Sequence, residues 1–402
     1  MEIRPILSTL QRHKTAAALI VLEIALSCAI ISNALFLIGN RIERIERPSG
    51  LAENEIVSIS IAGIGEDQNA NALTETDLAA LRAIPGVKFA SSVSQVPFGD
   101  SMWVTGIKLT ADQRVPTVDL NTYHGDSQTL DTLGLRLVQG RRFTEGEFSW
   151  NNDEKATIPS VIITKSAAEK LFPGQSALGK SIYTEDTPSK IVGIVEHFAR
   201  VNDYGGEASY DDSMLSPVKI SYNDGHRYLL RTDPDRRQEV LRQAVAILEK
   251  NSNSRIIEEK KTLEEMRRDF YRQDRSMSWL LVTMSIALLI VTALGIVGLA
   301  SFWVQQRTKQ IGIRRALGAT RGQILRYFQI ENFLLASVGI VLGMLMAYSI
   351  NLWLMARYEL PRLPLIYLPI GALTLWMLGQ IAVFWPARRA ALVPPAVATR
   401  SA

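Results

Sequence analysis

One segment matches a nucleotide-binding motif residue for residue. Residues 174–181, GQSALGKS, fit the pattern G-x-x-x-x-G-K-[ST], in which backbone N–H groups and the lysine hold phosphate. That chemistry needs a strand before the glycines and a helix after them, because the phosphate lies at the helix N-terminus. Here a helix-like segment ending at Leu171 comes first, and the β-like residues 181–183 follow. Because the order is inverted, we interpret the segment as a turn between a helix and a strand.

Other residue types that could support catalysis are scattered along the chain. The four histidines share no metal-ligand spacing, and no serine lies in a nucleophile-elbow sequence. The histidines are His13, His124, His197 and His226. The single cysteine, Cys28, lies within an apolar run, so no internal disulfide can form. We therefore predict no catalytic residue, no metal site and no cofactor bound by this chain.

An acidic residue, Glu23, interrupts the first apolar run. It follows Lys14 by nine residues, which is about 13 Å along a helix, so it does not lie at the edge of the run. A carboxylate in a bilayer is costly and normally faces a helix bundle, a cavity or a partner. Two interpretations remain open. Glu23 is either a conformational or gating element, or a packing residue that is neutral because it is protonated or that is hydrogen-bonded across a dimer.

A stripe of small residues marks the third apolar run. Gly339, Gly343 and Ala347 recur at four-residue spacing, which allows two helices to approach closely. Packing within the subunit and contact with a second subunit both fit this pattern. Gly295 and Gly298 in the second run present the same choice.

The segment 305–331, QQRTKQIGIRRALGATRGQILRYFQIE, is basic and amphipathic. Six basic residues stand against one acid, Glu331, at its end. Its apolar residues recur at roughly helical spacing, which predicts a helix with an apolar side. They are Ile311, Leu317, Ile324, Leu325 and Phe328. A short basic loop between membrane spans belongs on the cytoplasmic side, where this helix would meet a partner.

Four apolar runs are long enough to cross a bilayer, which takes about 20 residues. Basic residues flank them in the N-terminal segment, the 305–331 segment and the tail, so both termini are expected in the cytoplasm. A secretory signal peptide is the alternative for the first run, but its length favours an uncleaved anchor. The pI near 9 reflects these flanking arginines and not a nucleic-acid surface. The expected order is a cytoplasmic segment 1–14, span 15–39, external domain 40–276, span 277–304, cytoplasmic loop 305–332, span 333–356, external loop 357–364, span 365–385 and cytoplasmic tail 386–402.

The external block has an α+β pattern, with two βα-rich parts on either side of a central insertion. Strands are predicted at residues 55–61, 88–96, 103–109, 115–120, 160–163, 190–195 and 254–258, and a hairpin at 218–221 with 227–231. Helices are predicted at 74–83, 127–133, 165–171 and 234–250. Thr262 and Glu265 form a capping-box pattern whose helix is expected to continue directly into the second span.

Residues 307–343 resemble the signature of MacB/FtsX-type ABC transporter permeases, R-T-x-E-I-G-I-x-R-A-x-G-A before the third span. The N-terminal RHK, the segments 133–147 and 171–196, and the terminal PARRAALVPPAVATR also resemble this family. The resemblance covers nearly the whole chain. It implies a membrane protein with four α-helical spans, arranged one plus three. A large α+β periplasmic core domain lies between spans one and two, in a bacterial inner membrane.

The resemblance further implies how such a chain works. The permease forms a homodimer or pairs with a homologous permease, and two separate ATPase subunits supply the energy from ATP and Mg²⁺. The loop after span two docks on the ATPase, and spans one and two transmit its motion to the periplasmic domain. The residues at the coupling positions are Arg307, Ile311, Gly312, Ile313, Arg314, Arg315, Ala316, Leu317, Gly318 and Ala319. Gln310 departs from the family, which usually has Glu there.

The cargo and the further partners are implied only by class. An exporter of this type would move an antimicrobial peptide, a macrolide-like compound or a lipoprotein, with a periplasmic adaptor and an outer-membrane channel as possible partners. The alternative is an FtsX-like signalling subunit that controls a periplasmic enzyme. In either case no nucleic acid is expected as a partner.

Overall fold

The computed structural model describes residues 14–64, 69–153, 157–184, 187–202, 209–222, 226–358 and 362–392. The chain divides into two compact units. The helical unit contains the residues up to Glu46 and those from Gln273 onward. The mixed unit runs from Arg47 to Arg272. Each unit is described separately below.

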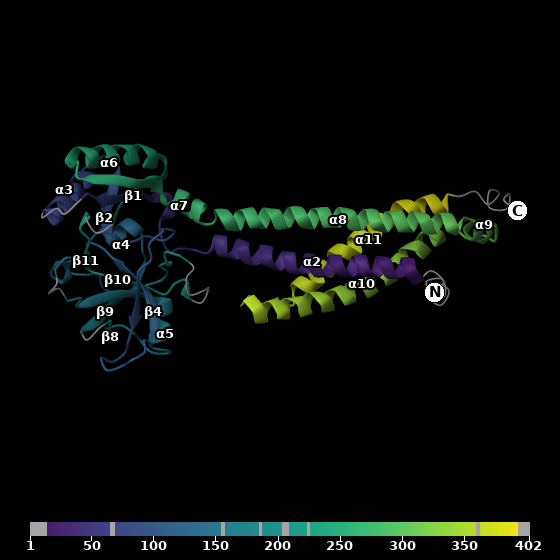
Figure 1. Ribbon diagram of the computed structural model, residues 1–402, viewed down its shortest axis with the longest axis horizontal. Coiled ribbons are helices and arrows are strands. Elements are labelled where there is room, and N and C mark those ends of the chain that lie inside the picture. Colours follow the sequence, from purple (N-terminus) through teal and green to yellow (C-terminus); the bar gives the residue numbers. More distant parts are fainter. Residues whose placement is uncertain are drawn as a thin grey trace. The chain divides into compact units, whose positions relative to one another are not determined.

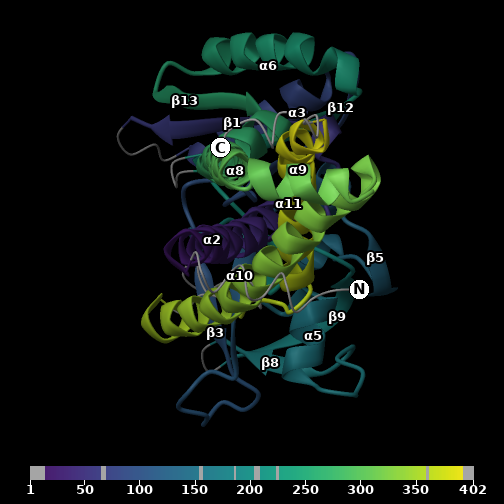
Figure 2. The same cartoon turned by 90° about the vertical axis from the view of Figure 1, so that its right-hand side faces the viewer.

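The helical unit contains four long apolar helices, each long enough to cross a membrane. They are α2 (Lys14–Glu46), α8 (Arg272–Gln306), α10 (Arg321–Tyr358) and α11 (Tyr367–Ala391), and the short α9 (Thr308–Ala316) joins α8 to α10. Helix α10 packs against α2 and α11, as Figure 2 shows. Ile24, Ile340 and Leu375 are among the residues of their shared core. Helix α8 buries only a narrow stripe, and the rest of its apolar surface is exposed, as suits contact with lipid.

One sheet of the mixed unit draws its strands from both ends of that unit. Its antiparallel order is β13 (Arg255–Thr262), β1 (Ile56–Gly63), β12 (His226–Thr232) and β2 (Val87–Val93). Helices α3 (Ala70–Arg82) and α6 (Arg237–Asn251) cover one face of it (Figure 1). Val57, Ile59 and Ile61 alternate along β1 and share an apolar core with residues of these helices. The two flanking parts predicted from the sequence therefore form a single sheet.

The central residues of the mixed unit form a second, mixed sheet. Strand β4 pairs in parallel with β10, and β7 with β9, whereas the other pairs are antiparallel. The order is β3 (Val104–Ile107), β4 (Val118–His124), β10 (Ser213–Ser216), β7 (Ser160–Thr164), β9 (Pro188–Val195) and β5 (Leu137–Gly140), with β8 (Ser181–Tyr183) also on β9. Helix α5 (Lys165–Leu171) packs on this sheet.

Shorter elements complete the mixed unit. Strand β6 (Ser149–Trp150) pairs in parallel with β11 (Val218–Lys219). Two further helices are α4 (Thr129–Leu133) and α7 (Leu263–Phe270), and the 3₁₀ turns are η1 (Glu53–Glu55), η2 (Glu145–Glu147) and η5 (Pro234–Arg236).

Two predicted helices have the start that their sequence suggests. Helix α5 begins after Thr164, whose hydroxyl accepts a hydrogen bond from the Ala167 N–H. The capping box of Thr262 and Glu265 is present at the start of α7. Helix α3 is different, because it begins at Ala70 and not at Thr74. The Thr74 hydroxyl donates to the carbonyl of Ala70 from inside the helix, so it caps nothing.

Two other predictions were wrong. Residues 218–221 and 227–231 do not form a hairpin, because β11 pairs with β6 whereas β12 lies between β1 and β2. The helix that starts after Thr262 does not run directly into the second apolar helix. Helix α7 ends at Phe270, and Tyr271 has φ −89° and ψ 13°, which interrupts the α-helical backbone before α8 begins.

Candidate functional site at the basic helix α9

Local backbone signals define both ends of α9. Arg307 stands at its N-terminal cap, directly after α8. Gly318 has φ +97°, a left-handed conformation that ends helices and favours glycine. The N–H of Ala319 returns to the carbonyl of Arg314, which closes this C-terminal turn. Thr320 and Gln323 then bond reciprocally, side chain to backbone, and start α10.

One side of α9 packs into the helical unit. Ile311 is 5% exposed and Gly312 is buried. Ile311 belongs to the same apolar core as Trp303, Ile324 and Phe328. This side therefore fixes α9 to the helices before and after it, and it is closed to any partner.

The other side of α9 presents two apolar side chains. Ile313 is 53% exposed and Leu317 is 83% exposed, and they lie one helical turn apart. Lys309 and Arg314 are exposed near them, as is Arg321 at the start of α10. We call Ile313 and Leu317, with these three basic residues, the α9 surface. The two apolar side chains can be buried in a groove of a partner protein, and the basic residues around them can attract acidic groups at the edges of that groove.

Three arginines attach α9 to other helices. Arg307 pairs with Glu331 of α10 at 2.8 Å, and both side chains are buried. Arg315 donates from Nη1 to the carbonyl of Ala391 at the C-terminal end of α11, 2.9 Å away. The Arg314 guanidinium lies 5.0 Å from the centre of the Tyr327 ring. These contacts attach α9 and its N-terminal cap to α10 and α11 within the helical unit.

The ten coupling positions implied by the family resemblance thus fall into three groups. Arg307, Ile311 and Gly312 are buried, whereas Arg315 and Ala319 are half-buried. The exposed positions are Ile313, Arg314, Ala316, Leu317 and Gly318, and Gln310 is exposed as well. Sequence reasoning did not assign Glu331 to this site. Its position as the only acid of the basic segment was the available signal.

Glu23 and the small-residue stripe lie on α2 and α10 respectively. The Glu23 carboxylate occupies the space where a side chain at Gly295 of α8 would stand. One turn further along, the hydroxyls of Ser27 and Thr292 share a hydrogen bond of 2.7 Å. The α2–α8 contact is therefore partly polar.

The stripe of α10 packs against α2 within the same chain. A methyl group on Gly339 would lie 2.9 Å from Cβ of Ile24, and one on Gly343 would lie 2.5 Å from Cβ of Cys28. Ala347 is fully buried, and its carbonyl accepts from Asn33 of α2 at 3.3 Å. The two helices can approach this closely only because the stripe lacks larger side chains.

Ion pairs stabilise the ends of the segments that connect the units. In the helical unit, Asp274 of α8 bonds Arg41 of α2 at 2.5 Å. In the mixed unit, Arg267 of α7 bonds Glu53 at 2.5 Å and donates to the carbonyl of Arg47. Each unit therefore holds its two connecting segments together by charged contacts.

Residues 174–181 form the turn that the inverted order predicts. Gly174 and Gly179 have positive φ, and the segment leads from α5 into β8. The N–H groups of Gly179 and Lys180 already donate to the carbonyls of Ile191 and Ala177. A phosphate would find neither a helix N-terminus nor these N–H groups available.

Comparisons with known proteins agree across both units. Residues 17–248 match the MacB-like periplasmic core domain, and residues 282–395 match the FtsX-like permease C-terminal domain. The uncharacterized ABC transporter permease YvrN of Bacillus subtilis (strain 168) is 25% identical over 410 residues, which cover 96% of each chain.

Two further proteins are similar to this chain, and in each case the alignment covers only part of at least one of the two proteins. The macrolide export ATP-binding/permease protein MacB of Neisseria gonorrhoeae is 26% identical over 85% of this chain. The alignment covers 51% of that protein, so this chain spans about half of its length. The solved extracellular domain of the transporter YknZ from Gram-positive bacteria is 19% identical, with a TM-score of 0.33, and its whole length aligns with 50% of this chain.

Proposed function

Since the chain belongs to the MacB/FtsX-type ABC transporter permeases, we propose that it is the membrane subunit of an ATP-driven export complex. A separate ATPase subunit, in two copies, would bind and hydrolyse ATP with Mg²⁺. The α9 surface would receive the ATPase, and the permease would act as a dimer with itself or a homologous chain. The relative named for macrolide export supports an amphipathic cargo, and a periplasmic adaptor and an outer-membrane channel would complete the route.

The exposed pair Ile313 and Leu317 is the observation that carries this proposal. Exposed apolar side chains on a membrane protein are expected where lipid covers them. These two lie on a short helix between two long apolar helices, beside Lys309 and Arg314. By the positive-inside rule this basic helix lies in the cytoplasm, the compartment that contains ATP. A groove with acidic edges on an ATPase would bury the apolar pair and contact the basic residues beside it.

The attachments of α9 suggest how the motion would be transmitted. Through Arg307 and Arg315, the helix is tied to α10 and α11, and it continues directly from α8. A push on α9 would therefore move α8, whose first residues connect to α7 of the mixed unit. Under this proposal the mixed unit is periplasmic and moves with each ATP cycle. Cargo need not cross the membrane through this subunit.

The test replaces both anchors, Ile313→Asp with Leu317→Asp, and measures binding of the cognate ATPase to the purified chain in lipid nanodiscs. That ATPase is identified as the subunit whose hydrolysis the wild-type chain stimulates. Two unpaired charges at the centre of the contact should cost about 2 kcal/mol each, so binding should weaken about 1000-fold. The control is Val115→Asp with Ile256→Asp, two similarly exposed apolar residues of the mixed unit. Undiminished ATPase binding by the α9 variant would contradict the assignment.

A further inference from the structure

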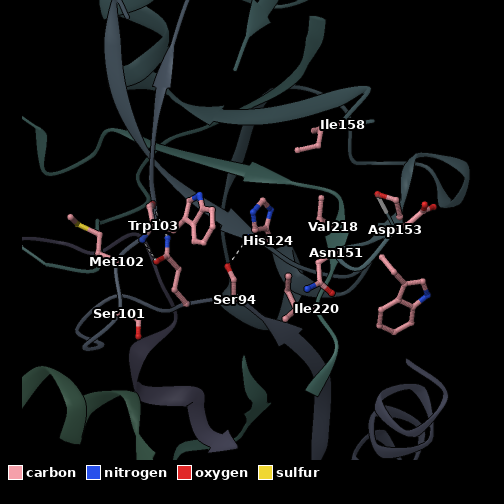
Figure 3. Close-up of a pocket in the computed structure, with 13 residues that line it drawn as sticks. Ser94, Ser101, Met102, Trp103, His124, Asn151, Asp153, Ile158, Val218 and Ile220 are labelled. Carbon is pink, nitrogen blue, oxygen red and sulfur yellow. Dashed lines mark hydrogen bonds between the residues drawn. The ribbon is translucent and has the colours of Figure 1, made fainter. Parts of the chain in front are cut away.

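The mixed unit contains a cavity of about 640 Å³ (Figure 3). Its walls come from segments that are far apart in the sequence. Ser94 follows β2, Trp103 precedes β3, and His124 ends β4. Trp150 of β6 and Ile220, just after β11, line it as well. The cavity therefore lies where strands of all three sheets come together, and its volume is in the range of sites for drug-sized ligands.

Trp103 is an exposed aromatic ring on a fixed backbone. Its indole side chain is 65% exposed although it lines the cavity. The amide of Gln95 holds its backbone from both sides, since Oε1 accepts from the Trp103 N–H at 2.7 Å and Nε2 donates to its carbonyl at 3.3 Å. Nε2 also donates to the carbonyl of Thr122, 2.7 Å away in β4. These bonds fix the backbone to which the indole is attached, and the exposed indole can stack on a flat apolar group.

Two polar side-chain atoms of residues that line the cavity have no hydrogen-bond partner among the described residues. They are Nδ1 of His124 and Oγ of Ser149, and both are buried. The backbone N–H of His124 donates to Ser94 Oγ at 3.0 Å, which fixes this end of β4. Burial lowers the pKa of the His124 ring to about 4, so the ring is neutral near pH 7 and can both donate and accept. Buried polar atoms without partners are unfavourable, and a ligand can supply the missing bonds.

The charge of the walls limits the class of ligand. Among the described residues that line the cavity, Asp153 carries the only formal charge at pH 7, and neither lysine nor arginine is present. Met102, Ile158 and Val218 add apolar surface. Among these described lining residues an anion would meet apolar side chains and a carboxylate but no cation, so its desolvation there would be uncompensated.

We propose that this cavity binds a non-anionic amphipathic molecule, with its flat apolar face on Trp103 and its hydrogen-bonding edge toward His124 and Ser149. The proposal goes beyond the coupling function and does not depend on it, because binding here requires no ATPase. Loss of ATPase docking and loss of binding in the cavity would therefore be separate results.

The experiment uses a cysteine introduced into the full chain in lipid nanodiscs. The native Cys28 is buried, and Ser101→Cys places a thiol at an exposed position lining the cavity. Its labelling rate with a water-soluble maleimide is measured with N-phenylnaphthylamine, a neutral aromatic amine. The same measurement uses anilinonaphthalenesulfonate, which has the same skeleton plus a sulfonate. The control is Ala246→Cys, an exposed position on α6 away from the cavity.

At about ten times its Kd, the neutral probe should slow labelling of the Ser101→Cys thiol about tenfold and leave the Ala246→Cys thiol unaffected. Adding Trp103→Ala should weaken the neutral probe about tenfold, so protection should fall to about twofold, and Trp103→Phe should restore most of it. Equal protection by anilinonaphthalenesulfonate would contradict the proposal that the cavity excludes anions. Absence of protection by the neutral probe, or full protection without Trp103, would overturn the site.

Discussion

Arg307 donates from Nη1 to both carboxylate oxygens of Glu331, at distances of 3.0 and 2.8 Å. Its side chain is 7% exposed and that of Glu331 is 2% exposed. The arginine stands at the junction of α8 and α9, whereas the glutamate lies on α10. The pair therefore closes the loop that presents the α9 surface. Replacing both members of a buried pair by apolar residues is often nearly neutral, whereas removing only one of them leaves a buried charge without its partner.

Glu331→Leu should destabilise the helical unit because it leaves the Arg307 guanidinium buried without an anion. The expected loss is about 3–5 kcal/mol in the free energy of unfolding, measured as a lower Tm of the detergent-purified chain. Arg307→Met with Glu331→Leu should recover most of that loss, since both charges are then absent. Glu239→Leu, which removes the exposed partner of Arg236, should cost less than about 1 kcal/mol. An unchanged Tm for Glu331→Leu would contradict a structural role for the pair.

The membrane helices could be predicted from the sequence because an apolar run of about 20 residues has one stable solution in a bilayer, which is a helix. The face of α9 could not be predicted in the same way. Ile311 and Ile313 are the same residue type two positions apart, yet one packs inside the unit and the other is exposed. Only the packing of α9 on Trp303 and Phe328 decides between them, and that contact is not local.

Non-local pairing also explains the wrong hairpin and the overlooked cavity. Val218 and Lys219 pair with Ser149 and Trp150, which lie about 70 residues earlier in the chain, so no turn signal marks them. The cavity joins Trp103, His124 and Trp150 from separate segments of the mixed unit, and their spacing in the sequence carries no pattern. The break at Tyr271 was missed because helix-forming residues continue on both sides of it.

Lys180→Ala should leave ATP hydrolysis by the assembled complex unchanged within about twofold, as for a surface substitution. Lys180 donates to Oε1 of Gln175 at 2.6 Å and lies 4.3 Å from the centre of the Phe172 ring. Both contacts belong to the turn after α5 and not to a phosphate site. The measurement is the hydrolysis rate of the permease–ATPase complex at saturating ATP. Abolished hydrolysis would reinstate the phosphate-loop interpretation of residues 174–181.

His226→Phe should reduce the loss of stability of the mixed unit in acid. Burial lowers the pKa of His226 from 6.5 to about 4; the backbone of Tyr222 and the charge of Asp77 raise it, and Arg255 lowers it, by smaller amounts. The unfolded chain therefore binds a proton that the folded chain does not, between pH 6.5 and 4. Above pH 6.5, His226 does not lower the free energy of unfolding. As the pH falls below 6.5, protonation of His226 in the unfolded chain lowers the free energy of unfolding, by about 2 kcal/mol at pH 5.

The measurement compares the Tm of wild type and His226→Phe at pH 7.5 and at pH 5. Phenylalanine keeps the edge-to-face contact with Tyr228, whose ring centre lies 4.7 Å away, so the fold should be retained. The decrease in Tm on acidification should be smaller in the variant. His124, whose pKa is also lowered to about 4, should maintain part of the decrease. Equal decreases in the two proteins would show that His226 contributes nothing to it.

Gly343→Ala should weaken the packing of α10 on α2, and Gly298→Ala should not weaken the helical unit. The added methyl group at Gly343 would lie 2.5 Å from Cβ of Cys28 and 2.6 Å from the carbonyl oxygen of Ala25. Because α2 supplies backbone atoms to this contact, the helices must separate, at a cost of about 1–3 kcal/mol. Apart from the neighbouring backbone of α8, no atom of the described residues lies within 4 Å of such a methyl group on Gly298. Alanine there should therefore be neutral or stabilise the helix by up to about 1 kcal/mol.

The two glycine variants are matched in chemistry, since each adds one methyl group to an apolar helix of the same unit. Gly343→Ala should have a lower Tm in detergent than Gly298→Ala. The two variants should also differ in how strongly they stimulate the ATPase. If α2 and α10 move as one body when the ATPase pushes on α9, Gly343→Ala should lower stimulation together with Tm. A Gly343→Ala chain that unfolds at the wild-type temperature would show that α2 and α10 do not need this close contact.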